Sequence, residues 1–298
     1  MTPIPPRRHR ARARAGAWTR DALLLTAAAV FLAPVVWLVL VPTRTEESIR
    51  DGFPFSIGSP ANIGRAWENL YAFNDGIVLR WIGNSLLYSS TGVVLSLVLC
   101  ITAGYGMAKF LFVGRKTLLI STLIAMIVPT SATVLPLYIE LAAVDLTGTA
   151  LSVILPLAFY PWGVYLAYTF FSSSLPDSLL EAARVDGASE VRIFFSVALP
   201  LARPLVALIG FFGFVSAWTN FMLPYLMLGD TDDYPLPLGL SVLPMENIVS
   251  GNPNFSNIDI GLPEAALAGV LSVLPILLMF LLAQRHLTSA QLAGSEKG

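Results

Sequence analysis

Six long stretches of this sequence contain no charged residue, and they constrain the fold more than any other feature. Each holds at least 20 residues; they are residues 22–43, 81–108, 117–139, 146–176, 204–229 and 265–284. A helix of roughly 20 apolar residues crosses the hydrocarbon core of a bilayer. Only 12% of the 298 residues are charged, against about 25% in a typical soluble domain. We therefore predict an all-α membrane protein with six transmembrane helices, and a soluble globular fold is excluded.

The charged residues predict the orientation of these helices. If the basic leader 1–21 is cytoplasmic and the six helices alternate, the cytoplasmic segments hold 14 Lys and Arg and the outer segments hold four. The positive-inside rule favours this orientation over its reverse, so both termini, including the tail 285–298, are expected in the cytoplasm. The transmembrane domain is expected to cover 22–284, with spans at about 22–43, 84–108, 117–139, 148–172, 203–229 and 264–284.

Several function classes find no support in the sequence. The net charge of −1 argues against a general nucleic-acid-binding protein. The single Cys100 cannot form an intrachain disulfide, and His9 and His286 lie in opposite terminal regions, so no metal site is expected. A phosphate-binding G-x-x-x-x-G-K-[ST] loop is absent, which predicts that the chain does not hydrolyse a nucleotide itself. The spans also lack the ionisable residues expected of a proton- or sodium-coupled carrier.

The connection between the fourth and fifth spans, residues 176–203, is predicted to form two short cytoplasmic helices. Pro176 followed by Asp177 is a helix start, and Gly187 is suited to terminate that helix. Helical periodicity puts Leu179, Ala182, Ala183 and Asp186 on one, mostly apolar face of the first helix, and gives the second helix an apolar stripe of Val191, Phe194, Phe195 and Ala198. The same geometry fits either an interfacial connector or a docking element for a cytosolic partner.

The residues of this loop resemble a known motif. Glu181-Ala182-Ala183, then Gly187, then Val197-Ala198-Leu199-Pro200 is similar to the EAA loop, E-A-A-x3-G-x9-I-x-L-P, of binding-protein-dependent ABC importer permeases, with Val197 in place of Ile. From Asn84 to Gly298 the chain resembles the shorter permease subunit of maltose-type carbohydrate importers. The segment 217–224 is similar to that family's W-N-D-F-x-x-P stretch, with Asn220 where Asp is usual.

This resemblance implies a non-catalytic permease subunit that carries a sugar, by family likeness a di- or oligosaccharide, across a bacterial-type cytoplasmic membrane. Its implied partners are a second permease subunit, a dimer of cytosolic ABC ATPases that bind ATP and Mg, and an external solute-binding protein; this chain would bind no cofactor itself. The implied ATPase-coupling residues are Glu181, Ala182, Ala183, Arg184, Asp186, Gly187, Leu199 and Pro200. The alternatives are a permease for another binding-protein-delivered solute, or an ATP-independent channel or carrier.

A sugar path needs aromatic faces and polar groups at membrane depth, where polar side chains usually face a bundle interior or a cavity. The candidates are Trp218, Thr219, Asn220, Tyr225 and Tyr165. The alternative interpretation is that the aromatic residues form interfacial belts and that Asn220 bridges two helices.

Overall fold

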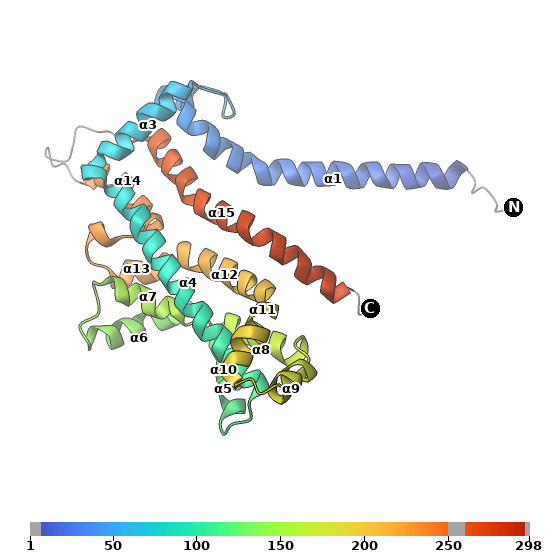
Figure 1. The fold of residues 1–298 in the computed structure, drawn as a ribbon. Coiled ribbons are helices and arrows are strands. Elements are labelled where there is room, and N and C mark those ends of the chain that lie inside the picture. Colours follow the sequence, from blue (N-terminus) through green and yellow to red (C-terminus); the bar gives the residue numbers. More distant parts are fainter. Residues whose placement is uncertain (1–6, 250–259, 296–298) are drawn as a thin grey trace. The chain divides into compact units, whose positions relative to one another are not determined.

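The computed structural model describes residues 7–249 and 260–295, and within them the side chains of residues 20–243 and 260–285. The described residues form helices joined by irregular connections, and they include no strand (Figure 1). The chain divides into two compact units. Unit 1 comprises Met1–Ala72 and Asn257–Val270, and unit 2 comprises Phe73–Ser256 and Leu271–Gly298.

Four helices of the described residues are long and apolar enough to cross a membrane, and the number rises to six if each of two bent helix pairs counts as one span. The four lie within Arg20–Thr43, Pro60–Lys109, Ala150–Ser173 and Leu262–Arg285. The bent pairs are Arg115–Ile127 with Thr130–Ala142 and Glu190–Leu201 with Arg203–Trp218.

Unit 1 contains a folded connection after its first long helix. Its elements are α1 (Arg7–Leu40), η1 (Val41–Thr43), α2 (Glu46–Asp51), α3 (Pro60–Ala72) and the first residues of α15 (Leu262–Ser295). Arg44 is 2% exposed and donates hydrogen bonds to the carbonyl oxygens of Ser48 and Pro54. Asn69 donates to Glu264 at 2.8 Å. These bonds satisfy backbone carbonyls of the connection 44–58 and fasten α3 to the start of α15.

Unit 2 is built around the long helix α4. Its elements are η2 (Phe73–Gly76), α4 (Ile77–Lys109), α5 (Arg115–Ile127), α6 (Thr130–Ala142), α7 (Ala150–Ala158), α8 (Pro161–Ser173), α9 (Asp177–Val185), α10 (Glu190–Ile193), the π-helical turn η3 (Phe194–Ala198), α11 (Leu199–Leu201), α12 (Arg203–Trp218), α13 (Met222–Met227), η4 (Thr231–Asp233), α14 (Leu236–Val249) and the rest of α15. Helix α4 packs along α7, α8 and α12.

Small residues allow α4 and α8 to approach closely. A Cβ added to Gly104 of α4 would overlap the Cβ of Ala167 and lie 2.8 Å from the backbone nitrogen of Tyr168. A Cβ added to Gly163 of α8 would lie 2.8 Å from the Sγ of Cys100. Packing of this kind is typical of membrane helices, which associate through small residues rather than through a hydrophobic driving force.

The third expected span, 117–139, is not a straight helix. It is divided between α5 and α6, which are bent by 110°. Val128 has extended backbone angles and Pro129 follows it, because a proline disfavours the helical conformation of the residue before it.

The fifth expected span, 203–229, is also interrupted. Helix α12 ends at Trp218, and α13 starts at Met222. Pro224 is the third residue of α13, where its missing N–H is tolerated, whereas in a continuous helix its ring would clash with the carbonyl of Asn220. Both expected spans are thus broken near a proline, Pro129 in the third and Pro224 in the fifth.

Candidate functional site

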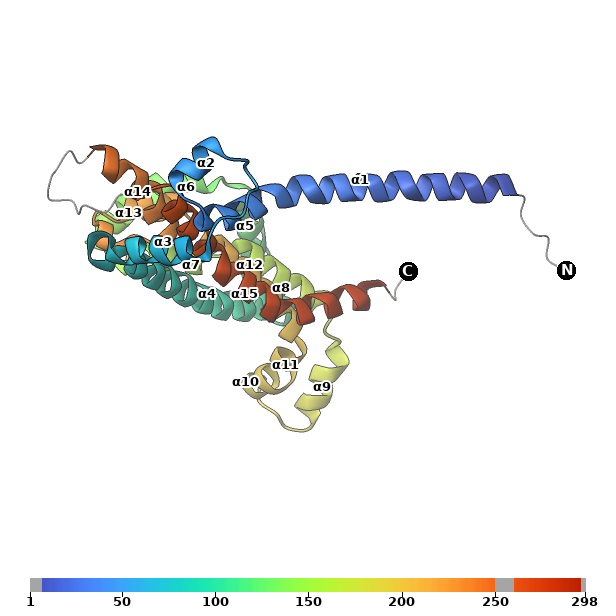
Figure 2. The same cartoon turned by 90° about the horizontal axis from the view of Figure 1, so that it is seen from above.

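The best-defined candidate site is the loop between α8 and α12, whose helices α9, α10 and α11 project away from the other helices of unit 2 (Figure 2). Its first helix, α9, is held by one buried side. Leu180 is 1% exposed and Ala183 packs against the same core, whereas Leu179, Ala182 and Asp186 are exposed. The face predicted to be apolar therefore lies mostly outward. Adjacent leucines at 179 and 180 give two competing apolar stripes, and periodicity alone could not select between them.

Gly187 ends α9 in the manner that the sequence predicted. Its φ of +79° lies in the left-handed region, which glycine adopts without steric cost. The N–H of Ala188 donates to the carbonyl of Ala183 at 3.0 Å, and the N–H of Gly187 donates to that of Arg184 at 3.0 Å. These two bonds define a Schellman motif, which fixes the sharp change of direction between α9 and α10.

An ion pair connects the two loop helices on their exposed side. Arg184 donates to Glu190 through Nε at 2.6 Å and Nη2 at 3.2 Å, a two-point geometry that is stronger than a single contact. The hydrogen bond from Arg184 lowers the pKa of Glu190, and the bond to Glu190 raises the pKa of Arg184. Both side chains are about two-fifths exposed, so the pair orients the loop more than it stabilises the fold.

The second half of the loop contains a π-helical turn that the sequence did not predict. In η3 the N–H of Leu199 donates to the carbonyl of Phe194, five residues earlier. The wider turn places Ile193 and Ala198 on one buried side, at 1% and 0% exposure, and leaves Phe195 60% exposed. Pro200 follows this turn; it has no N–H for the carbonyl four residues earlier, which accounts for the departure from α-helical spacing.

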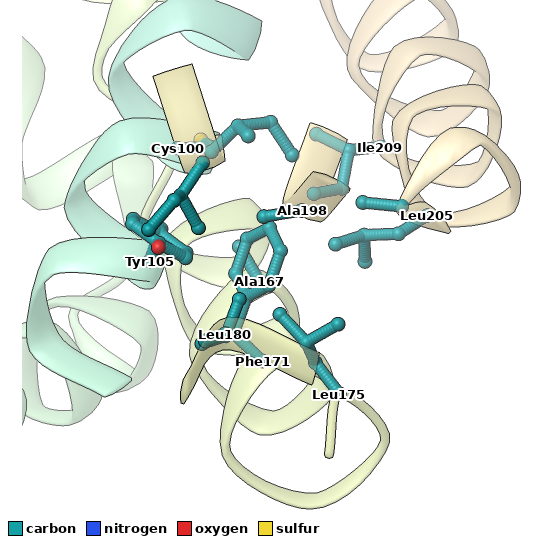
Figure 3. Packing of buried hydrophobic residues seen from close by; sticks show 12 residues of the cluster. Cys100, Tyr105, Ala167, Phe171, Leu175, Leu180, Ala198, Leu205 and Ile209 are labelled. Atoms are coloured by element: carbon teal, nitrogen blue, oxygen red, sulfur yellow. The ribbon is translucent and has the colours of Figure 1, made fainter. Parts of the chain in front are cut away.

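The buried sides of both loop helices join one apolar core with three membrane helices. Figure 3 shows this core between α4, α8 and α12. Its residues are almost fully buried and comprise Cys100, Ile101, Tyr105, Ala167, Phe171, Leu175, Leu180, Ile193, Ala198, Ala202, Leu205 and Ile209. A force applied to the loop is therefore transmitted directly to α4, α8 and α12, since close-packed interiors transmit strain.

The opposite side of the loop exposes a mixed apolar and charged surface. Glu181, Ala182 and Asp186 are exposed, and Val185 and Val191 are 87% and 67% exposed. Exposed apolar side chains bordered by charges are typical of protein–protein and membrane contact sites. Leu199 and Pro200 are only partly exposed and belong to the packed side.

Trp218 is buried among helices of unit 2. It is 2% exposed, its Nε1 donates to the carbonyl of Ser272 in α15 at 2.9 Å, and its ring stacks on Phe214 at 5.5 Å. Its N–H is therefore already used in joining α12 to α15.

Of the other substrate-path candidates, Thr219 and Asn220 lie at the break between α12 and α13, Tyr225 lies within α13, and Tyr165 lies within α8. Thr219 donates to the carbonyl of Val215 at 2.8 Å, and the side-chain oxygen of Asn220 accepts from the N–H of Leu223 at 3.3 Å. Tyr225 is 56% exposed and Tyr165 is partly exposed. The break between α12 and α13 thus presents polar groups at membrane depth, where irregular backbone is tolerated if it lines a cavity or is buried in protein.

Lys109, at the end of α4, is a site residue that the sequence interpretation missed. Its side chain is 5% exposed, and its Nζ donates to the carbonyl of Leu175 at 2.8 Å and to Asp177 at 2.6 Å. This hydrogen bond lowers the pKa of Asp177. The available signal was that a lysine ends the second expected span and an aspartate follows the fourth, both at the predicted inner membrane edge.

Comparisons with known proteins agree on one class. A family model described as "Binding-protein-dependent transport system inner membrane component" matches residues 100–291. The arabinooligosaccharides transport system permease protein AraQ of Halalkalibacterium halodurans is 32% identical over 92% of this chain and 96% of that protein. The diacetylchitobiose uptake system permease protein NgcG of Streptomyces coelicolor is 28% identical over 92% of this chain and 87% of that protein.

The fold also matches a solved structure. A chain of a bacterial ABC transporter involved in the import of the acidic polysaccharide alginate superposes with a TM-score of 0.79, covering 95% of this chain and 99% of that chain at 21% identity. The predicted all-α membrane fold is confirmed by this likeness, which shows the architecture of the chain.

Proposed function

The chain belongs to the family of binding-protein-dependent transport system inner membrane components, and from that membership we propose that it is a permease subunit of an ATP-driven sugar importer. The cargo is a di- or oligosaccharide, because relatives aligned along 92% of the chain are named for arabinooligosaccharides and diacetylchitobiose. Another solute delivered by a binding protein is the alternative, and the solute held by the cognate binding protein discriminates between the two.

The working complex contains two permease subunits, two cytosolic ABC ATPases that bind ATP and Mg, and an external solute-binding protein. This chain lies in a bacterial-type cytoplasmic membrane with both termini in the cytoplasm. The bias of 14 cytoplasmic Lys and Arg to four outside supports this orientation. It places the loop containing α9 on the ATPase side.

The observation that carries the proposal is the two-sided loop. Leu180 anchors its inner side in the membrane-helix core, while Glu181 and Ala182 face outward. The outward side of α9 docks into an ATPase cleft, where the small Ala182 permits close approach and Glu181 meets a basic group. Closure of the ATPases moves α9, and the shared core carries α8 and α12 with it.

Thr219, Asn220 and Tyr225, at or near the break between α12 and α13, and Tyr165, within α8, are proposed to line the sugar path. Hydroxyl and amide groups there offer hydrogen bonds to sugar hydroxyls, and the tyrosine rings offer apolar faces. Trp218 supports this region by joining α12 to α15 through its bond to Ser272.

Uptake measured in proteoliposomes containing the whole complex tests the proposal. We expect Glu181→Ala and Gly187→Pro to abolish coupling of ATP hydrolysis to uptake while the protein still inserts. Glu47→Ala, at an exposed glutamate of α2, is the matched control and should retain uptake. Normal ATP-driven uptake by both loop variants would overturn the assignment, and uptake without the ATPases would favour a channel or carrier.

A further inference from the structure

The inner end of α4 contacts the loop although it is distant from it in sequence. The loop is covalently continuous with α8 and α12, so those helices must follow its movement. Helix α4 ends at Lys109, 66 residues before Leu175 and 68 before Asp177. Movement of the loop can therefore reach α4 only through noncovalent contacts.

Lys109 makes the first of these contacts, at the start of α9. Its ammonium group bonds both the carbonyl oxygen of Leu175 and the carboxylate of Asp177. The Lys109 side chain is 5% exposed whereas that of Asp177 is 74% exposed. A lysine is almost never buried without a partner, because desolvation of its charge is costly. These two bonds therefore hold the Lys109 side chain at the junction of α4 and α9.

Tyr105, one helical turn earlier, makes the second contact. Its ring meets Phe171 of α8 at 5.2 Å and Phe194 of the π-helical turn at 5.0 Å between ring centres. Tyr105 is 4% exposed. Lys109 bonds the first half of the loop and Tyr105 contacts the second half, and both residues lie at the same end of α4.

The remainder of α4 is fixed to its neighbours. Gly104 brings its backbone against Ala167 of α8, and the helix continues along α7 and α12. A displacement received at Lys109 is therefore passed along a continuous 33-residue helix rather than being absorbed at a flexible joint.

We propose that Lys109 is a positioning residue for energy coupling: its bonds to Leu175 and Asp177 make α4 move with the coupling helix α9. This inference rests on the proposed importer function. The lysine contacts neither solute nor nucleotide. It acts by keeping α9 and α4 in one rigid body. Without the ammonium group, α4 is joined to the loop only by apolar contacts, such as that of Tyr105 with Phe194, and it follows the movement of α9 less closely.

The test is the ratio of solute transported to ATP hydrolysed, measured in proteoliposomes of the whole complex. Lys109→Met keeps the apolar stem of the side chain and removes the ammonium group. We expect the ratio of solute transported to ATP hydrolysed to fall about tenfold, the scale associated with one hydrogen bond to a charged group. ATP hydrolysis itself should be retained. Lys109→Arg should restore the ratio, because a guanidinium also donates to a carbonyl and a carboxylate. Lys116→Met, at an exposed lysine of the same inner turn, is the matched control.

Asp177→Asn covers the case in which Lys109→Met fails to assemble. Its side chain is exposed, so the fold tolerates the change, and loss of the ionic half of the contact should lower the ratio by a smaller factor. An unchanged ratio in Lys109→Met, or in Asp177→Asn where Lys109→Met does not assemble, would overturn the inference. Absence of ATP-driven uptake by the unmodified complex would instead refute the importer function, so the two failures are distinguishable.

Discussion

Gly187 and Gly106 give a sharp test of the loop geometry, because the same substitution should have opposite effects at the two sites. A Cβ added at either glycine meets no atom within 4 Å, so steric overlap does not contribute. Gly187 has a φ of +79°, where an L-residue costs about 1–2 kcal/mol. Gly106 lies inside α4 with helical backbone, where replacing glycine by alanine stabilises by about 0.5–1 kcal/mol.

Hydrogen exchange of the loop amides measures the first effect. In Gly187→Ala, exchange of the Ala188 amide, which is bonded to the carbonyl of Ala183, should accelerate by about 5- to 30-fold. Gly187→Asn should lie between glycine and alanine, because asparagine tolerates the left-handed region better than other residues do. Gly106→Ala should leave the loop amides unchanged and raise the thermal unfolding midpoint. Equal exchange in Gly187→Ala and the unmodified protein would refute the reasoning from the positive φ.

Three further effects follow from the same region. Carbon-detected NMR should show a higher pKa of Glu190 in Arg184→Gln, because the hydrogen bond that lowers this pKa is lost. Since the pKa of Glu190 is lowered in the folded protein, the ion pair contributes to stability at neutral pH, and this contribution is lost as the pH falls through that pKa. An unchanged pKa of Glu190 in the variant would contradict the contact. Gly104→Val should prevent α4 from packing on Ala167 and so reduce the yield of folded protein in detergent, which normal yield would disprove. The Tyr105 hydroxyl is buried without a hydrogen-bond partner among the described residues. Tyr105→Phe should therefore raise the thermal unfolding midpoint by the equivalent of about 1 kcal/mol, the lower end of the cost of an unsatisfied buried polar group. A lowered midpoint would show that the hydroxyl is bonded.

Local signals in the sequence predicted the outline of the loop between α8 and α12 well. Pro176 and Gly187 mark the two ends of its first helix, and the structure places α9 between them. Such signals are reliable because a helix start and a left-handed end depend on the residues at those positions themselves. The membrane class was equally accessible, since the absence of charge over a whole span is a local property.

Features that depend on distant partners were not accessible from the sequence. The burial of Leu180 rather than Leu179 is decided by the core that α4 and α8 provide. The hydrogen bond from Trp218 to Ser272 joins residues 54 positions apart, and neither residue by itself predicts its partner. The π-helical turn before Pro200 required knowledge of which side chains, Ile193 and Ala198, the membrane helices would bury.

The two ends of α9 are restrained by different kinds of contact, and this difference determines how the loop can move. Its start is fixed by Lys109 and by the buried Leu175, both of which belong to the membrane-helix junction. Its end is held within the loop by Gly187 and by the exposed pair of Arg184 with Glu190, and otherwise by apolar packing of Ala183 and Ala188 against the core. A push on the outward face of α9 therefore cannot slide the helix away from α4. Because Leu180 lies in the shared core between these ends, a displacement of α9 would displace the packed residues of α4, α8 and α12 with it.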